Sequence, residues 1–361
     1  MPTGTGAVAL RNLPVTKYQI NPALFNQLTS RIVFDPINFA LPSSGNYQNT
    51  QLLQVGIVGS INLIVTGTIT TTGTTVNITP TAHYPWDLIS VQISGNGQNN
   101  FISCTGWDLT DRLRASNRAY TDSVSSYPAA GGSPFNAAGS ASFTLAYKIP
   151  IAMDDTTLVG ALYAQSEATN LVLKVSRAVD SDLFNVTAGT ISVTGTVYVE
   201  EEIFEVPYNP SQPDTLVIPD LTVLHGLVSN DNAVASQTTL DTQLFRINGQ
   251  LERLFFQTWN LSTATQPALV PTASYVQAQL IYGSNQNPYT FNPMNFARFR
   301  NNRDYRTVFP DGRYVIDFVA DNPARDLVLL EGVTNLRLRT QYSSAPTGGS
   351  YVHFVQETLF A

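Results

Sequence analysis

The stretch "IVGSINLIVTGTI", residues 57–69, indicates the fold class, because its side chains alternate in character at every second position. Its odd positions are apolar apart from two glycines, and its even positions are mostly polar, which is typical of a half-buried β-strand. The same alternation recurs at residues 89–93, 171–175, 314–318 and 336–338. Turn-rich segments separate these runs, and no long helical periodicity occurs. The sequence therefore predicts an all-β chain with a few short helices.

The composition limits the function. The 361 residues are enough for two ordinary domains or one large β-domain. Charged residues make up 12%, about half the usual share, which also suits a chain that covers much of its surface with neighbours. The net charge of -7 disfavours a nucleic-acid coat. Cys104 is the single cysteine, so an intrachain disulfide or a thiolate metal cluster is excluded.

The sequence also predicts a soluble protein. Its first residues lack the basic region and apolar core of a signal peptide. Residues 36–86 contain no charged side chain, but polar residues and glycines interrupt the apolar part. That region therefore falls short of the ~20 apolar residues that a membrane-spanning helix requires.

Two halves of the chain resemble each other. "TNLVLKVSR" (169–177) matches "TNLRLRTQY" (334–342), and "YVEEEIF" (198–204) matches "FVQETLF" (354–360). The offsets, 165 and 156 residues, differ by only nine. Each half also has an arginine-bearing segment upstream of these strands, at 106–118 and 295–306. Ordered matches at similar offsets indicate a duplicated β-domain.

The proline-rich segment "VPYNPSQPD", residues 206–214, falls between the two halves. Prolines favour an extended, polyproline-type strap with few ladder hydrogen bonds. We therefore expect a linker here.

Residues 147–165, "YKIPIAMDDTTLVGALYAQ", interrupt the strand pattern of the first half. Asp154 or Asp155 is expected to cap a short helix, with Leu158, Ala161 and Leu162 on one face. The expected role of this segment is structural, covering an open end of a β-sandwich.

Catalytic and ligand-binding motifs are missing from the sequence. His83, His225 and His353 stand in no metal-binding spacing, so ordinary packing or surface histidines are expected. No phosphate-binding loop and no nucleophile elbow occurs. The run Glu200–Glu202 is interpreted as a charged, solvated edge or a row of salt bridges rather than a catalytic carboxylate pair. We expect no catalytic, cofactor-binding or metal-binding residue, and no cofactor.

The two arginine-bearing segments are expected to be helices that use their charges for pairing. Arginines 298, 300, 303 and 306 are interpreted as pairing with acidic residues within or between subunits, rather than with nucleic acid. In the first segment, the spacings predict Asp108–Arg112 and Asp111–Arg114 pairs, and Thr105 with Asp108 forms a loose capping box.

Several of these segments resemble the double jelly-roll major capsid protein of tectivirus-type, membrane-containing icosahedral bacteriophages. The strongest match is "IPIAMDDTTLVGALYA" followed by "LVLKV"; the matched positions are Pro150, Ala152, Leu158, Gly160, Ala161 and Ala164. Three weaker matches follow the family order: "TGWDL" (105–109), "IPDLTVL" (218–224) and "FPDGRY" (309–314). The matches run from about residue 105 to residue 342, and the first hundred residues match by architecture only.

The resemblance implies three parts: an N-terminal arm with inner-face contacts (residues 1–30), a first jelly roll (31–207) and a second jelly roll (208–361). It implies a homotrimer of pseudo-hexagonal outline that tiles the icosahedral shell of a double-stranded DNA virus. The implied partners are neighbouring capsid trimers, minor capsid or penton proteins, and the inner viral membrane near the arm, without sequence-specific nucleic-acid binding. The implied location is the virion capsid, after synthesis in the host cytoplasm, and the implied protein is not an enzyme.

Two other functions remain open at this stage. A carbohydrate-binding adhesin or spike would be expected to carry a secretion signal or an attachment tail. A glycan-processing hydrolase on paired jelly rolls would require a cleft with converging carboxylates, since the fold alone cannot exclude it.

Overall fold

The computed structural model describes residues 17–95, 98–116, 124–154, 156–165, 170–234, 236–245, 249–261, 267–282, 286–305, 308–319, 328–333 and 335–360. All structural statements below concern these residues. Within them, no helix is both long enough and apolar enough to cross a membrane.

The first half of the chain forms a jelly roll of two facing sheets. One sheet has the order β3-β11-β5-β8 and the other the order β4-β10-β6-β7. The strands are β3 (Ile37–Ala40), β4 (Tyr47–Gln51), β5 (Ile57–Pro80), β6 (Ile89–Gly95), β7 (Gln98–Thr105), β8 (Gly139–Pro150), β10 (Leu171–Arg177) and β11 (Phe184–Phe204). Two short strands, β2 (Arg31–Val33) and β9 (Leu162–Tyr163), extend the first sheet along β11 and β5.

The second half repeats this arrangement. Its sheets have the orders β14-β23-β16-β20 and β15-β22-β18-β19. The strands are β14 (Leu224–Ala233), β15 (Thr239–Gln243), β16 (Gln250–Leu261), β18 (Tyr275–Tyr282), β19 (Gln286–Phe291), β20 (Arg313–Asp317), β22 (Leu336–Tyr342) and β23 (Tyr351–Phe360). The short strands β17 (Pro267–Leu269) and β21 (Val328–Leu329) pair with β16.

The repetition extends to the helices. In the first roll the order is α3 (Gly106–Ser116), β8, β9, β10, β11, and in the second it is α5 (Asn295–Tyr305), β20, β21, β22, β23. A short 3-10 turn precedes the fourth strand of each roll: η2 (Trp86–Leu88) before β6 and η3 (Thr272–Ser274) before β18. Both arginine-bearing segments are therefore helical, as predicted, and the all-β double jelly-roll prediction is confirmed.

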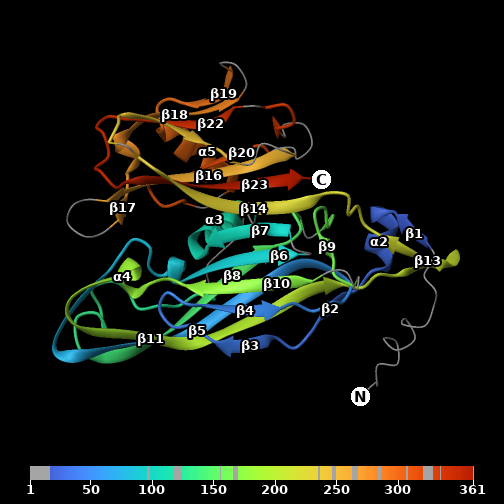
Figure 1. The fold of residues 1–361 in the computed structure, drawn as a ribbon, viewed down its shortest axis with the longest axis horizontal. Helices are drawn as coiled ribbons and strands as arrows, with labels where there is room; N and C mark the ends of the chain where they lie inside the picture. The colour runs from blue at the N-terminus through green and yellow to red at the C-terminus, as the bar shows by residue number, and fades with distance from the viewer. Residues whose placement is uncertain are drawn as a thin grey trace.

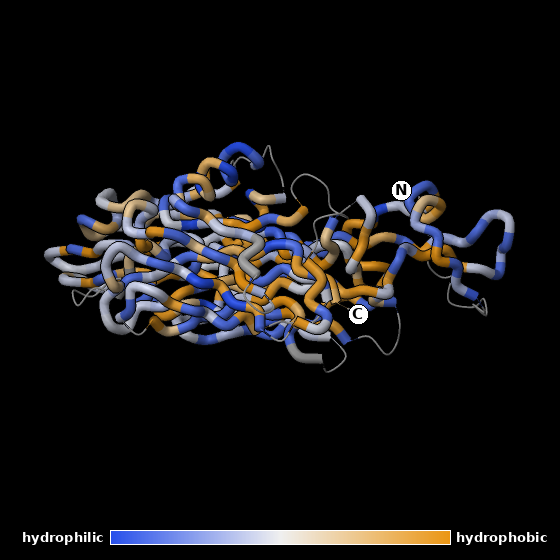
Figure 2. Tube along the Cα trace, turned by 90° about the horizontal axis from the view of Figure 1, so that it is seen from above, coloured by the Kyte–Doolittle hydropathy of each residue, from blue (hydrophilic) through white to orange (hydrophobic). Residues whose placement is uncertain are grey.

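Alternation along the strands places the core between the two sheets of each roll. In β5 the residues predicted to face inward are buried: Ile57, Ile61, Leu63, Val65 and Ile69. One large apolar cluster fills the first roll and a second fills the second roll. Seen from above, with the long axis of the molecule horizontal, most hydrophobic segments lie inside, and hydrophilic segments dominate the peripheral loops (Figure 2).

The two rolls lie side by side and share one sheet. β7 of the first roll pairs in parallel with β14 of the second, Leu227 opposite Ile102 and Val228 opposite Ser103. This pairing joins strands of both rolls into a single ten-stranded sheet. α3 lies at the place where the rolls meet (Figure 1). The apolar cluster of the first roll accordingly includes Phe255 and Val355 of the second.

A further, three-stranded sheet lies beside the rolls (Figure 1). β1 (Lys17–Ile20) pairs in parallel with β13 (Gln212–Ile218), which also pairs with β12 (Tyr208–Asn209). Within 206–214 the ladder pairs are those of the β12–β13 hairpin, Tyr208 with Leu216 and Asn209 with Gln212, while the pairing with β1 begins at Thr215. The segment therefore has few ladder pairs, as predicted, but part of it folds back as a short hairpin. Residues Pro22–Leu28 form the short helix α2, and the Asn21 side chain accepts a bond from Leu24 N at 3.1 Å.

The helix expected near Asp154 does not form. Residues 151–160 make bends and turns up to β9, and Asp155 lies outside the described residues. Leu158 has a left-handed backbone (φ 54), which a helix cannot accommodate. Asp154 does cap, but it caps a turn, accepting from the Thr157 backbone N at 3.0 Å. Leu158 and Ala161 are buried in a small cluster with Phe25 and Val217, so the segment closes the end of the roll beside the arm.

Candidate functional site

The face along which the two rolls meet contains the densest set of buried charges in the described structure. We call it the interdomain junction; it comprises polar side chains from η2, α3, β14, β16, β20 and β23. These elements belong to different rolls, so each ion pair across the junction ties one roll to the other.

Glu357 on β23 is at the centre of the junction. It is fully buried, accepts from Arg112 Nε (2.8 Å) and Arg253 Nη1 (3.0 Å), and has an oxygen 2.9 Å from His225 Nε2. Burial by itself would raise the pKa of this carboxyl, but the Arg112 and Arg253 guanidiniums outweigh it and hold the pKa well below its usual range. Arg112 comes from the first roll, and therefore the ionised carboxylate links the rolls.

A second link runs from β20 to α3. Arg313 donates to Asp111 at 2.6 Å, and its guanidinium lies over the Trp107 ring, 4.0 Å from the centroid. The predicted Asp111–Arg114 pair is present at 3.0 Å. The predicted Asp108–Arg112 pair is wrong, because each of these side chains reaches across the junction to a strand of the second roll.

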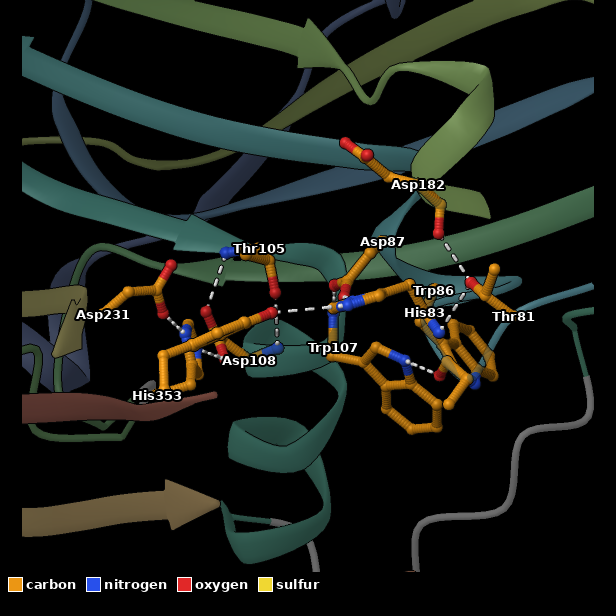
Figure 3. A network of polar contacts seen from close by, with 12 residues as sticks. Thr81, His83, Trp86, Asp87, Thr105, Trp107, Asp108, Asp182, Asp231 and His353 are labelled. Atoms are coloured by element: carbon orange, nitrogen blue, oxygen red, sulfur yellow. Dashed lines mark hydrogen bonds and ion pairs between the residues drawn. The ribbon is translucent and has the colours of Figure 1, made fainter. Parts of the chain in front are cut away.

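His353 on β23 provides a third link (Figure 3). Its Nε2 lies 2.9 Å from Asp108 and its Nδ1 lies 2.6 Å from Asp231. Burial lowers the pKa of His353, but the Asp108 and Asp231 carboxylates outweigh it and raise the pKa to about 10. Asp108 also accepts from Thr105 N at 2.8 Å, which confirms the predicted capping box. Asp108 therefore both caps the start of α3 and binds a side chain of the second roll.

Beside His353 a cleft of about 540 Å³ opens between the rolls. His83 lies on its wall, bound to Asp87 at 2.6 Å and stacked on Trp259 with the ring centroids 4.1 Å apart. Of the carboxylates that line the cleft, Asp87 and Asp231 are each hydrogen-bonded to a histidine. These two carboxylates are therefore already engaged with side chains of the protein.

All three histidines thus lie at the junction, which no motif or spacing in the sequence predicts. A signal was present: β23 is buried along nearly its whole length, yet it contains His353 and Glu357 among apolar residues. Ionisable residues in such a strand need partners. Those partners come from α3, more than 240 positions away in the sequence, and no spacing rule could supply them.

The acidic run on β11 is partly as expected. Glu202 pairs with Arg31 at 3.3 Å and with Lys148 at 4.0 Å, and its pKa is lowered: Ser60 and Asn62 hydrogen bonds and these cations overcome the effect of burial. Glu201 is not on a solvated edge, because β11 lies inside its sheet. It is buried and accepts from Leu53 N at 3.0 Å, and burial raises its pKa to about 7.

The arginines of α5 pair within the second roll. Arg298 contacts Asp311 at 3.2 Å and Arg303 contacts Asp304 at 2.6 Å. Arg300 lies over the Phe291 ring at 5.6 Å. Arg306 lies outside the described residues. The interpretation of these arginines as pairing residues is therefore supported for two of the four.

No protein-family model matches the sequence, and no curated protein matches it. Solved structures are similar in fold. The STIV MCP aligns with a TM-score of 0.69 at 14% identity, over 92% of this chain and 96% of that one. The PBCV-1 virus capsid aligns with a TM-score of 0.56 at 13% identity, over 97% of this chain and 96% of that one. The major capsid protein of bacteriophage PM2 aligns with a TM-score of 0.52 at 9% identity, over 92% of this chain and 98% of that one. At these identities the similarity shows the fold, which is that of double jelly-roll capsid proteins.

Proposed function

We propose that this chain is the major capsid protein of a membrane-containing, icosahedral double-stranded DNA virus, and that it acts as a structural protein rather than an enzyme. The observation that carries this proposal is the pair of topologically identical rolls joined through β7 and β14. A homotrimer of such chains has six similar corners, so a three-fold object can occupy hexagonal positions in a shell. The matching structures with this fold are viral capsid proteins.

The two equivalent helices support the trimer. α3 is largely buried where the first roll meets the second, and its second residue, Trp107, contacts Arg313 of the second roll. α5 has the same place in the second roll, but its second residue, Phe296, is 56% exposed and Phe299 is 62% exposed. In a ring of alternating rolls, α5 would face the first roll of the next subunit as α3 faces the second roll of its own. Exposed aromatic residues at this position suit such a contact.

The remaining partners and the division of the chain are part of the same proposal. Residues 1–30 form the arm, 31–207 the first roll and 208–361 the second, with β12 and β13 packed on the arm. The arm would lie at the inner face, near the viral membrane and neighbouring trimers, and minor capsid or penton proteins would complete the shell. The virion capsid is the proposed location, after synthesis in the host cytoplasm.

The native mass of the purified protein tests the proposal. We expect a stable trimer of three times 39.3 kDa that persists on dilution. The double variant Phe296→Asp/Phe299→Asp should be monomeric, because it places two charges in the predicted contact. Val186→Asp is the matched control: it changes an exposed apolar residue on β11 and should remain trimeric. A monomeric wild-type protein, or a trimeric double variant, would contradict the proposed assembly.

A further inference from the structure

Glu252 is a buried carboxylate whose charge has no visible partner. It lies at an irregularity of β16, where Leu251 pairs with Thr358 and Arg253 already pairs with Glu357, so Glu252 is an extra residue in the ladder. Its side chain is 0% exposed, and neither of its oxygens has a hydrogen-bond partner among the described residues. Burial, together with the negative charge of Glu357, raises its pKa to about 8. A carboxyl group in this position either keeps a proton or binds a cation.

The neighbouring His225 also has a ring nitrogen that faces an acceptor. Its Nδ1 lies 3.2 Å from the Pro150 carbonyl oxygen, which can only accept, so the hydrogen of a neutral ring is on Nδ1. The bare Nε2 then points at Glu357 Oε1, 2.9 Å away. Two acceptors at this distance repel each other unless a proton or a metal ion lies between them.

We propose that His225, Glu252 and Glu357 form a binding site for a divalent metal ion of the Zn²⁺ class. One ligand atom from each residue lies within 4.8 Å of the others, and all three residues are buried. An imidazole nitrogen with two carboxylate oxygens is a ligand set that Zn²⁺ accepts. The bond from Nδ1 to a backbone carbonyl is the usual way in which a metal-binding histidine is oriented.

The charges around the site also favour a cation. Arg112 and Arg253 lie at Glu357, and Asp317 pairs with Arg253 at 2.9 Å. When Glu252 is ionised, the three carboxylates Glu252, Glu357 and Asp317 face two guanidiniums, and the cluster has a net negative charge that a bound cation would offset. One metal ion would satisfy both Glu252 and His225, whereas protons could do so only by occupying both groups.

The ligands come from three strands of the second roll, and the first roll closes the site. Pro150 holds the His225 ring, and Gly160 lies against the His225 backbone, where an added Cβ would come within 2.8 Å of the nitrogen. The ion would therefore bind before the rolls close and would stabilise the junction once they have closed.

The test is refolding from denaturant with or without Zn²⁺. Wild-type protein is refolded in ZnCl₂ or in EDTA and desalted, and its metal content and thermal midpoint are measured. We expect about one Zn²⁺ per chain and a higher midpoint after refolding in ZnCl₂. Glu252→Gln should lose both the metal and the increase in midpoint. Its amide is isosteric and uncharged, so the variant is expected to fold.

Glu201→Gln is the matched control, since it changes a buried glutamate of the first roll that already has a backbone partner. It should retain the metal and the increase. A wild-type protein that is metal-free with equal midpoints in both buffers would overturn the metal site and assign the missing charge to protons. Retention of the metal by Glu252→Gln would place the ion elsewhere and would equally overturn the site.

Discussion

Glu201 and Glu357 occupy the same position in the two rolls, fourth in "YVEEEIF" and "FVQETLF", yet their environments differ. Both are buried on the last strand of a roll. Glu201 accepts a bond from the Leu53 backbone, and burial raises its pKa to about 7. Glu357 meets Arg112, Arg253 and His225, and its pKa is well below the usual range despite deeper burial.

This difference shows that the position in the strand determines whether the glutamate is buried, whereas the neighbouring side chains determine whether its carboxyl group is ionised. Burial disfavours an ionised carboxyl at either position. Only at Glu357 does a guanidinium from the other roll outweigh that effect, because α3 of the first roll packs against β23. In the duplicated strand, the electrostatics of the second copy therefore depend on the contact between copies.

The largest expected effect is the loss of the charge at Glu357. Glu357→Gln should lower the free energy of unfolding by about 3–5 kcal/mol, since it leaves two buried guanidiniums without their carboxylate. Denaturant unfolding at pH 8 measures this value. Glu201→Gln, the equivalent change in the first roll, should be neutral or stabilising at this pH.

The direction in which stability changes with pH at Glu201 follows from its raised pKa. An acid with a higher pKa in the folded state contributes stability below its unfolded pKa of about 4.5, and this contribution is lost as the pH rises towards 7. Glu201→Gln should remove that slope. Equal losses in both glutamine variants at pH 8 would show that the two sites are not electrostatically different.

The next prediction compares two glycines that share a left-handed backbone conformation. Gly160 (φ +80) touches His225 of the second roll, whereas a Cβ added at Gly332 (φ +78), after β21, would meet open space. Gly160→Ala should cost about 3 kcal/mol, from backbone strain and a clash at the junction, and Gly332→Ala about 1–2 kcal/mol from strain alone. Thermal unfolding of both variants compares them, and equal costs would show that the junction is loose at Gly160.

The smallest expected effect is the pH dependence of His353, whose equivalent in the first roll is the apolar Val197. Its folded pKa of about 10 lies above the unfolded value of 6.5. The stability from the His353 ion pairs is therefore complete below about pH 6.5 and is lost as the pH rises to about 10. His353→Gln should remove about 2 kcal/mol at pH 6 and less at pH 10. A constant loss across this range would mean that the imidazole is neutral in the folded protein.

The strand pattern, the duplication and the two arginine-bearing helices could be predicted from the sequence, because they depend on local periodicity and on repeated segments. Ile57, Ile61 and Leu63 are buried as their alternation predicts. The resemblance at Pro150–Ala164 pointed to the paired jelly rolls. The same segment misled the helix prediction, since the left-handed Leu158 and the contact with the arm are set by packing and not by the local pattern.

The ion pairs of the interdomain junction, by contrast, follow from tertiary contacts and could not be predicted from the sequence. Arg112 and Glu357 are 245 positions apart, and the sequence offered Asp108 as the nearer partner for Arg112. Local spacing predicts pairs on an exposed helix, where neighbouring turns are the only choice. α3 is buried, and therefore its charges take partners from the other roll, where low solvent exposure makes each ion pair stronger and each missing partner more costly.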